Sequence, residues 1–324
     1  MRAVPESVRR FIAAVLLAAI AFPVAAQDFP SGTMRFYVGF APGTGSDLVS
    51  RLLAQKLSER LGQPVIVEQK VGSGGILASE TVVKSRPDGH TMVLLSGSHS
   101  VLAAMRKSLP YDPVRDFGMV GLVSSYPMVI SVRPDSPIKS LPDLIAGAKA
   151  APGRITYSMG SLGSMLHLLG EWMSIESGIS MVAVPFKGSA PALIDLLGGR
   201  IDVKMDTATA TFGQMRAGKV RALALSSPAR YPLAPDVPTI AETIPGVEVS
   251  SWLGLVVAPA TPRPIIDRLN SEIRAIIDTP EVRQRFAELG GIPTGSTPEE
   301  MRDQIAREIQ RWKRVVELRH IERQ

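Results

Sequence analysis

Strand-like and helix-like runs alternate along most of this chain, and that alternation constrains its fold more than any other feature. Residues 34–40, 65–68 and 91–95 are apolar with β-branched or aromatic members, as buried strands are. Between the first two runs, residues 48–61 carry leucine and valine at helical spacing, and the run ends at Gly62. This spacing is typical of βαβ units. It predicts an α/β fold with a parallel sheet covered by helices on both faces.

The same pattern starts again after a proline-rich turn, which predicts a second α/β unit. Two strand-like segments, residues 120–132 and 249–257, flank the second unit and are predicted to cross between the units. We therefore expect two lobes: residues 27–124 with 252–324 in the first, and residues 125–251 in the second. A cleft between such lobes opens and closes by hinge motion, and a ligand is expected there, beyond the carboxyl ends of the parallel strands.

Several helices in the second half of the chain are predicted to begin after capping residues. Ser140 precedes a helix that runs to residue 150, with Asp143 at its third position. Thr279 and Thr297 each precede a proline, and Glu300 completes a capping box with Thr297. The other elements expected in this half are helices over residues 163–177 and 189–197, and strands over 155–157, 181–186, 201–205 and 220–226.

The first 26 residues have the pattern of a secretion signal and are excluded from the fold. Arginines precede the almost wholly apolar residues 11–22, and Val24-Ala25-Ala26 is a small-residue cleavage site. The apolar stretch is too short to span a bilayer comfortably. The mature protein is therefore expected in the periplasm, after removal of residues 1–26.

Composition excludes several classes of function. The chain has no cysteine, which excludes disulfides, thiolate nucleophiles and cysteine zinc sites. Its four histidines are too widely spaced for a short helical metal motif such as His-Glu-x-x-His. The net charge of +6 is mild, and the densest basic cluster, residues 302–323, alternates in sign with acidic residues. We therefore expect no metal, no cofactor and no nucleic-acid partner.

Three loops share one design, in which a strand leads through small residues into a helix: residues 40–47, 158–167 and 185–192. Glycine lets the backbone approach a ligand, hydroxyl groups donate hydrogen bonds, and helix N-termini attract anions. The loops therefore predict an anion site. Two other interpretations stay open: a dinucleotide fingerprint, which would need glycine where Leu48 stands, and helix capping alone.

Four residues in or near these loops have two interpretations each. His167 is either a ligand contact or a hydrogen-bonded structural histidine. Lys187 is either a counter-ion for a carboxylate or a solvated lysine, and Asp206 is either a cleft residue or a turn aspartate. Asp47 repels an anion, so it either stabilises the helix start or receives a ligand hydroxyl or ammonium. No serine lies in the Gly-x-Ser-x-Gly motif typical of hydrolases, so a secreted hydrolase that uses His167 lacks its usual signature.

Several short motifs follow one another along the chain. They are Phe40-Ala41-Pro42-Gly43-x-Gly45-Ser46-Asp47, Leu61-Gly62-Gln63-Pro64-Val65, Gly72-Ser73-Gly74-Gly75, Arg86-Pro87-Asp88-Gly89, Leu109-Pro110-Tyr111-Asp112-Pro113, Val184-Pro185-Phe186-Lys187-Gly188-Ser189-Ala190-Pro191-Ala192, Pro235-Asp236-Val237-Pro238-Thr239 and Ser251-Trp252-Leu253-Gly254. Together they resemble the Bug family, the periplasmic solute receptors of tripartite tricarboxylate transporters. Each motif is weak alone, but the set spans essentially the whole mature chain and is specific.

The resemblance implies a two-lobed type II periplasmic binding protein fold with a ligand cleft between the lobes. It implies a small organic carboxylate as ligand, held largely through backbone amides and hydroxyls and delivered to the membrane permease of a tripartite tricarboxylate transporter. We expect a monomer without enzymatic activity. A ligand-sensing module for a signalling system and a secreted hydrolase are the alternatives.

Carried onto matching positions, the resemblance implies a ligand grip from both lobes. The first lobe would contribute Phe40, Ala41, Gly43, Thr44, Gly45, Ser46, Asp47 and Ser98. The second lobe would contribute Ser158, Gly160, Ser161, Ser164, His167, Gly188, Ser189, Ala190 and Asp206. The chain departs from the family pattern at Thr44, Ser46, Met165-Leu166 and Thr207, and these departures concern the part of the ligand beyond its carboxylate.

Overall fold

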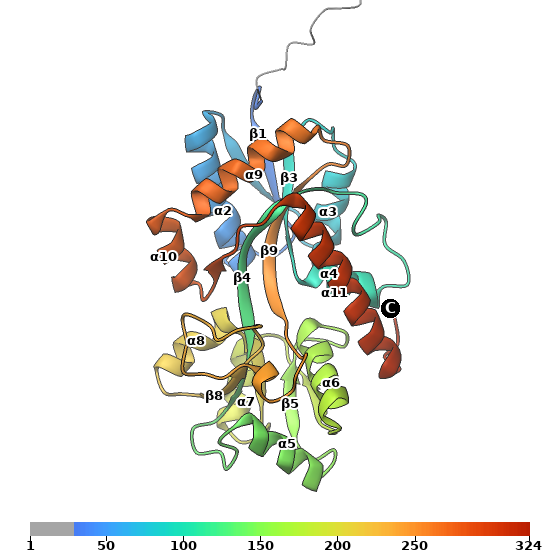
Figure 1. Ribbon diagram of the computed structural model, residues 1–324, viewed down its shortest axis with the longest axis vertical. Coiled ribbons are helices and arrows are strands. Elements are labelled where there is room, and N and C mark those ends of the chain that lie inside the picture. Colours follow the sequence, from blue (N-terminus) through green and yellow to red (C-terminus); the bar gives the residue numbers. More distant parts are fainter. Residues whose placement is uncertain (1–28) are drawn as a thin grey trace, which may run out of the picture.

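Two α/β lobes are joined by two long strands that pass from one lobe to the other (Figure 1). The computed structural model describes residues 29–324, so the predicted signal peptide lies outside the described residues. The two joining strands are β4 (Gly118–Val132) and β9 (Ser250–Val257), and both were predicted to cross between the lobes. Within the described chain, no helix has the length and apolarity that crossing a membrane requires.

The first lobe is built on a sheet with the strand order β10-β4-β9-β3-β1-β2. Its other strands are β1 (Met34–Val38), β2 (Val65–Gln69), β3 (Thr91–Ser96) and β10 (Ile292–Pro293). Strand β1 lies parallel to β2 and β3, as predicted, but β9 is antiparallel to both β3 and β4. The sheet is therefore mixed rather than parallel, because one joining strand leaves the lobe and the other returns to it.

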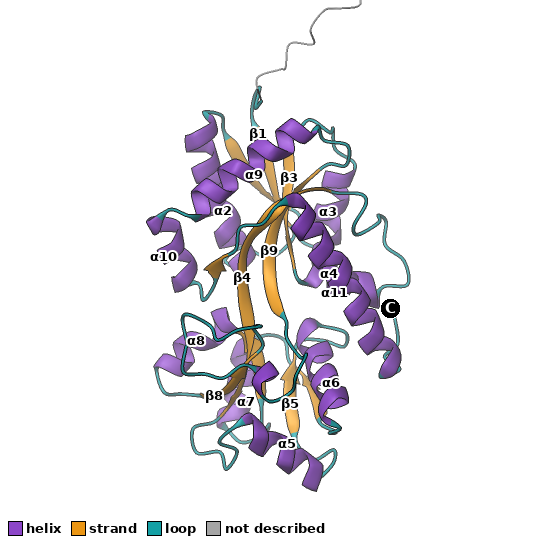
Figure 2. Cartoon of the chain, viewed as in Figure 1, coloured by secondary structure: helices purple, strands orange, loops and turns teal. Residues whose placement is uncertain are grey.

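Helices cover both faces of this sheet (Figure 2). They are α2 (Gly45–Leu61), α3 (Ile76–Val83), α4 (Ser98–Met105), α9 (Arg263–Ile277), α10 (Pro280–Glu288) and α11 (Pro298–Leu318). Leu53 of α2 and Ile273 of α9 belong to one hydrophobic cluster, whereas Val82 of α3 and Ile305 of α11 belong to another. Helix α11 also reaches the second lobe, where Trp312 joins the core and packs edge-on against Trp172.

The second lobe adds two strands to the far half of β4 and holds a separate parallel pair. Its strands are β5 (Thr156–Met159), β6 (Val182–Pro185), β7 (Lys204–Thr207) and β8 (Arg221–Leu225). Its helices are α5 (Leu141–Ala150), α6 (Met165–Ser177), α7 (Ser189–Leu197) and α8 (Ala208–Arg216). Strands β7 and β8 pair with β4, and β5 pairs with β6.

Most predicted elements are confirmed, together with their caps. Ser140 accepts a hydrogen bond from the Asp143 N–H, and Thr297 and Glu300 form the predicted capping box. The strand expected at residues 201–205 instead covers Lys204–Thr207. Helices α4 and α8 were not anticipated. Helix α8 contains two threonines and Gly213, which are poor helix formers, so the sequence carries only a weak helical signal there.

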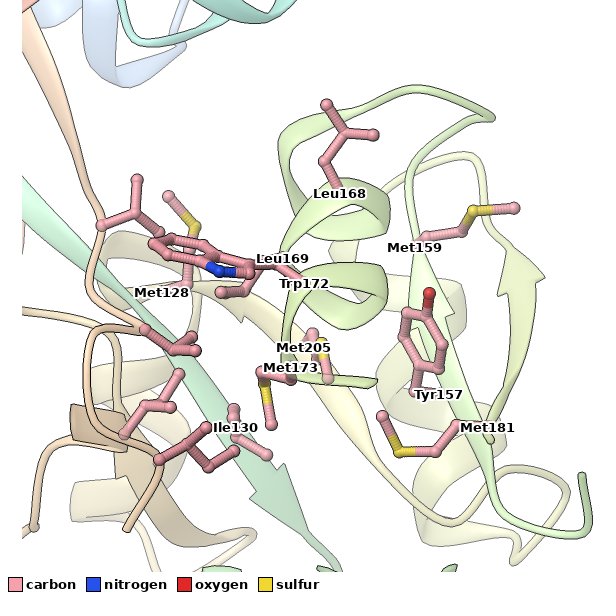
Figure 3. Close-up of a cluster of buried hydrophobic side chains, with 14 of the residues drawn as sticks. Met128, Ile130, Tyr157, Met159, Leu168, Leu169, Trp172, Met173, Met181 and Met205 are labelled. Atoms are coloured by element: carbon pink, nitrogen blue, oxygen red, sulfur yellow. The ribbon is translucent and has the colours of Figure 1, made fainter. Parts of the chain in front are cut away.

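The core of the second lobe fixes α6 against the sheet. Figure 3 shows Leu169, Trp172 and Met173 of α6 on the side of Met128 and Ile130 of β4. On its other side, α6 approaches β5 closely at Gly170. A Cβ atom at Gly170 would lie 2.5 Å from two ring carbons of Tyr157. The close approach holds α6, whose N-terminus lies at the cleft described below.

Gly170→Ala is expected to destabilise the protein, because the added methyl group overlaps the Tyr157 ring and overpacking costs about 1–3 kcal/mol. Gly213→Ala is the matched control. Its Cβ would have no atom within 4 Å, so the gain in helix propensity, up to about 1 kcal/mol, should stabilise α8. Urea unfolding of the two variants measures both free energies. Equal stability of the two variants would contradict the close packing at Tyr157.

Candidate functional site

A cavity of about 370 Å³ lies between the two lobes, beside the joining strands β4 and β9. It is lined from both lobes by Phe40, Thr44, Gly45, Ser46, Val49, Ser96, Ser98, Ser124, Tyr126, Met128, Gly160, Ser164, Met165, Leu166, Thr207, Thr209, Ser251, Leu253, Phe286 and Leu289. We call this cavity the cleft. Two contacts between the lobes flank it. The Met165 side chain reaches Gly97 on one side, and Thr209 lies against Gly290 on the other.

Four helices begin at the cleft: α2 and α4 from the first lobe, and α6 and α8 from the second. Ser164 caps α6 and Thr207 caps α8 through their side chains. The N-cap residues of α2 and α4, Thr44 and Gly97, make no side-chain cap. The first N–H groups of α2 and α4 are therefore free of side-chain caps, and such helix ends attract anions.

Asp47 organises the loop before α2 rather than lining the cleft. Its carboxylate accepts hydrogen bonds from the Gly43 N–H at 2.9 Å and from Gln69 Nε2 at 2.7 Å, and pairs with Arg51 at 3.0 Å. Burial raises the pKa of Asp47, but the hydrogen bonds from Gly43 and Arg51 outweigh burial and lower it. Asp47 is therefore ionised, and its charge is compensated by these donors. This contact set favours the structural interpretation of Asp47.

His167 stabilises the loop before α6. Its Nδ1 accepts a hydrogen bond from the Gly163 N–H at 3.0 Å, which requires an unprotonated Nδ1. Its Nε2 lies 3.8 Å from Glu171, which also pairs with Arg319 of the C-terminal segment. Burial lowers the pKa of His167, although the Glu171 carboxylate opposes the shift. The ring is therefore neutral near pH 7, and its contacts favour the structural interpretation.

A buried ion pair lies behind the start of α8. Lys204 is 1% exposed, and its Nζ lies 2.6 Å from the carboxylate of Asp206, which also accepts a hydrogen bond from the Thr207 N–H. Neither charged group is among the residues that line the cleft. The pair holds the junction between β7 and α8, so that Thr207 and Thr209 reach the cleft.

The structure brings part of the predicted grip to the cleft. Seven predicted residues line it: Phe40, Thr44, Gly45, Ser46, Ser98, Gly160 and Ser164. Ser158 lies behind the wall, where its hydroxyl bonds to the backbone of Met205. The other predicted residues that do not line the cleft are Ala41, Gly43, Asp47, Ser161, His167, Gly188, Ser189, Ala190 and Asp206. Their contact with a ligand stays a prediction.

Residues of the joining strands line the cleft, and sequence reasoning did not select them. Ser124, Tyr126 and Met128 alternate along β4, and Ser251 and Leu253 alternate along β9. Burial raises the pKa of Tyr126, so its phenol stays neutral. The two-residue period in a segment predicted to join the lobes is the signal that could have found these residues.

The cleft combines hydroxyl groups with apolar walls and lacks charge. Ten serine, threonine and tyrosine hydroxyls lie in its lining, together with Met128, Met165, Leu166, Phe286 and Leu289 among the apolar residues. Among the described residues, no lysine, arginine, aspartate or glutamate lines it. An anion in the cleft would be held by N–H and O–H donors rather than by an ion pair.

The neutral His167 predicts a pH dependence of stability. Because its pKa is lower in the folded chain, the unfolded chain takes up the proton first as the pH falls below about 6.5. The stability that the neutral ring supports is present above that pH and is lost on acidification. His167→Asn keeps an acceptor near the Gly163 N–H but cannot titrate.

Urea unfolding near pH 7.5 and near pH 5.5 measures the unfolding free energy of the wild type and of His167→Asn. The wild type should lose more unfolding free energy on acidification than His167→Asn, while the buried His99 contributes to both. An identical loss in both proteins would show that His167 is not held neutral in the fold.

Comparison with known proteins identifies the family. Residues 49–321 match the family model described as tripartite tricarboxylate transporter family receptor, TctC. Protein BugT of Bordetella pertussis (strain Tohama I) is 37% identical over 306 residues, which cover 93% of this chain and 94% of BugT.

Two solved structures are also similar to this chain. R. palustris Rpa4515, solved with adipate, has a TM-score of 0.77 and 32% identity, and the match covers 91% of this chain and 99% of the Rpa4515 chain. MatC from Rhodopseudomonas palustris, with bound malate, has a TM-score of 0.73 and 32% identity, and the match covers 89% of this chain and 100% of the MatC chain. The predicted fold and family are confirmed, and the chain belongs to the Bug or TctC family, the non-enzymatic periplasmic receptors of tripartite tricarboxylate transporters.

Proposed function

We propose that this protein captures a small organic carboxylate with an apolar body in the cleft and delivers it to the permease of a tripartite tricarboxylate transporter. The observation that carries the proposal is the convergence of four helix N-termini on a cavity lined by hydroxyl groups and apolar side chains. The adipate and malate bound to the two relatives support a carboxylate as the ligand. The predicted signal peptide supports action in the periplasm.

Neutral donors are strong enough to hold a carboxylate. A hydrogen bond to a charged group contributes about 1.5–3 kcal/mol, and a helix N-terminus adds about 0.3–2 kcal/mol. Micromolar affinity requires about 8 kcal/mol. Four or five donors from helix starts such as Gly45 and Ser98 therefore suffice, provided that closure of the lobes excludes water.

The apolar walls argue for a ligand with few charges beyond its carboxylate. Met165 and Leu166 of α6 face the cleft, as do Phe286 and Leu289 at the end of α10. A further charge buried against these side chains would have no counter-ion and would cost several kcal/mol. The chain departs from the family pattern at Met165-Leu166, so this wall is where the ligand preference of this receptor would be set.

A hydrolase is not supported by the same geometry. Both ring nitrogens of His167 face protein groups, Gly163 and Glu171, and the ring does not line the cleft. His167 is therefore not directed at a cleft serine as a general base. Delivery to a sensor instead of a permease would use the same capture step.

Isothermal titration of ligand-free protein with a panel of acids tests the proposed ligand class. Carboxylates with aliphatic or aromatic bodies should bind, whereas the matching amides and highly charged tricarboxylates should bind at least about tenfold more weakly, because they lose the charge-assisted hydrogen bonds or bury unpaired charge. If only the tricarboxylates bind, the proposed apolar preference is wrong. If no acid in the panel binds, the capture function itself is contradicted.

The amide grip is tested by Gly45→Pro, with Gly45→Ala as the matched control. Gly45 is the first residue of α2, where proline fits, and Thr44 before it is extended (φ −71°, ψ 160°), as a residue before proline should be. A Cβ at Gly45 would meet no atom within 4 Å, so both variants should fold.

Proline removes the Gly45 N–H and alanine keeps it. Gly45→Pro should weaken binding of the best carboxylate by about tenfold or more, whereas Gly45→Ala should bind like the wild type. Titration calorimetry measures both affinities. Equal carboxylate affinities of the two variants would show that the Gly45 N–H does not contribute to binding.

A further inference from the structure

The two joining strands separate the cleft from a second cavity on their opposite face. Tyr126 pairs with Ser251 and both face the cleft, whereas Ser125 pairs with Trp252 and both line the second cavity. This alternation follows from the two-residue period of a strand. The second cavity has a volume of about 550 Å³, and we call it the hinge cavity.

Both lobes contribute walls to the hinge cavity. The first lobe supplies Gln304, Arg307, Glu308 and Arg311 of α11, and the second lobe supplies the loop after β8 with Ser227, Arg230 and Tyr231. The Tyr231 hydroxyl lies 3.2 Å from the carbonyl oxygens of Ser125 and Gly290, so this loop already contacts the first lobe at the cavity. A ligand in the hinge cavity would therefore touch both lobes.

Three arginines and two glutamates, Glu248 and Glu308, line the hinge cavity. Arg230 is paired with Glu242, and Arg311 donates to the carbonyl oxygen of Glu248. Arg307, one turn before Arg311 on α11, is exposed, and within residues 29–324 no carboxylate lies within ion-pair distance of it. Its guanidinium is thus available for a ligand.

The carboxylate of Glu308 in this lining is already occupied. Its two oxygens share the single N–H of the Trp252 indole, at 3.0 and 2.9 Å, and one of them also accepts a hydrogen bond from Gln304 at 3.1 Å. Burial raises the pKa of Glu308, and these donors only partly offset that shift. Arg230 is paired with Glu242 and Arg311 lies near the Glu308 carboxylate, so Arg307 is the lining arginine that, among the described residues, has no carboxylate partner.

One buried donor in the same wall has no partner. Ser227 is 5% exposed, and its hydroxyl makes no hydrogen bond. Buried hydroxyls in folded proteins are nearly always hydrogen-bonded, and the protein itself supplies no partner for the Ser227 hydroxyl in the wall of this polar cavity. An oxyanion supplies an acceptor for this hydroxyl, and arginine binds oxyanions through paired N–H groups.

We propose that the hinge cavity binds a multivalent oxyanion of the phosphate type, held by Arg307 and Arg311 of α11 together with Ser227 and Arg230 of the opposite loop. Lobe closure over the cleft separates the walls on the opposite face of the hinge strands. The bound anion therefore favours the open form and opposes capture in the cleft. This antagonism rests on the proposed function of the cleft, whereas anion binding itself does not.

Titration calorimetry with inorganic phosphate tests the site, with sodium chloride of equal ionic strength as the control for screening. The wild type should show saturable binding. Arg307→Gln and Ser227→Ala should each weaken it, the first by about tenfold. Arg302→Gln is the matched control, because Arg302 is an exposed arginine of the same helix that does not line the cavity, and it should bind phosphate like the wild type.

Two results would overturn the site: no saturable heat beyond that of chloride, or unchanged phosphate affinity in both Arg307→Gln and Ser227→Ala. Loss of phosphate binding in Gly45→Pro would assign the phosphate to the cleft and would overturn the proposed site as well.

The antagonism is tested separately with a carboxylate that the cleft binds. Saturating phosphate should lower the carboxylate affinity of the wild type but not of Arg307→Gln, and an unchanged or higher wild-type affinity would contradict the antagonism. If the cleft binds no carboxylate, the phosphate titration still decides the site.

Discussion

The antiparallel pairing of β4 with β9 is the interaction on which the rest of this structure depends. It runs from Gly118 opposite Val257 to Pro127 opposite Ser250, and so extends from the sheet of the first lobe to the border of the second. Because side chains alternate across a strand, this ribbon presents one set of residues to the cleft and another to the opposite face. A change in register by one residue would exchange the two sets. The pairing thus fixes both which residues line the cleft and where the two lobes are joined.

The charged side chains near the cleft lie behind its lining and not in it. The Lys204–Asp206 pair and the Asp47 carboxylate with its donors lie beside the cleft, yet both are satisfied within the protein. Their role is to position backbone at the starts of α8 and α2. The groups that face the cleft are hydroxyls, N–H groups and apolar side chains. A receptor built this way can hold an anion and release it without breaking a buried ion pair, which would cost several kcal/mol.

Local sequence signals predicted most elements of the architecture, because periodicity and helix caps depend only on residues that are close together in the sequence. The helix from Gly45 to Leu61, the capping box at Thr297 and the two joining strands follow from periodicity and cap chemistry. The strand directions around β9 could not be predicted in the same way, since they depend on how the chain returns from the second lobe. Helix α8 was missed because its threonines and glycine suppress the helical signal, although packing of Phe212 against the second lobe offsets that deficit.

The candidate site was predictable only in part, for a related reason. The loop before α2 was identified from glycines and hydroxyls that are adjacent in sequence. Tyr126, Ser251 and Leu289 reach the cleft only through the pairing of distant segments, and the two-residue period of the joining strands is the local signal for the first two alone. For His167 and Asp206, burial and hydrogen-bond partners favour the structural interpretation, and contact with a ligand stays a prediction.

A crystal structure of the closed protein with a bound acid from the tightest-binding class tests the central claim most directly. The account predicts that the carboxylate oxygens lie within hydrogen-bond distance of N–H groups at the start of α2 and of donors at the start of α6 or α8, with the body of the ligand against Met165 and Leu166. A carboxylate paired with an arginine or lysine side chain, or bound away from both sets of helix starts, would contradict it.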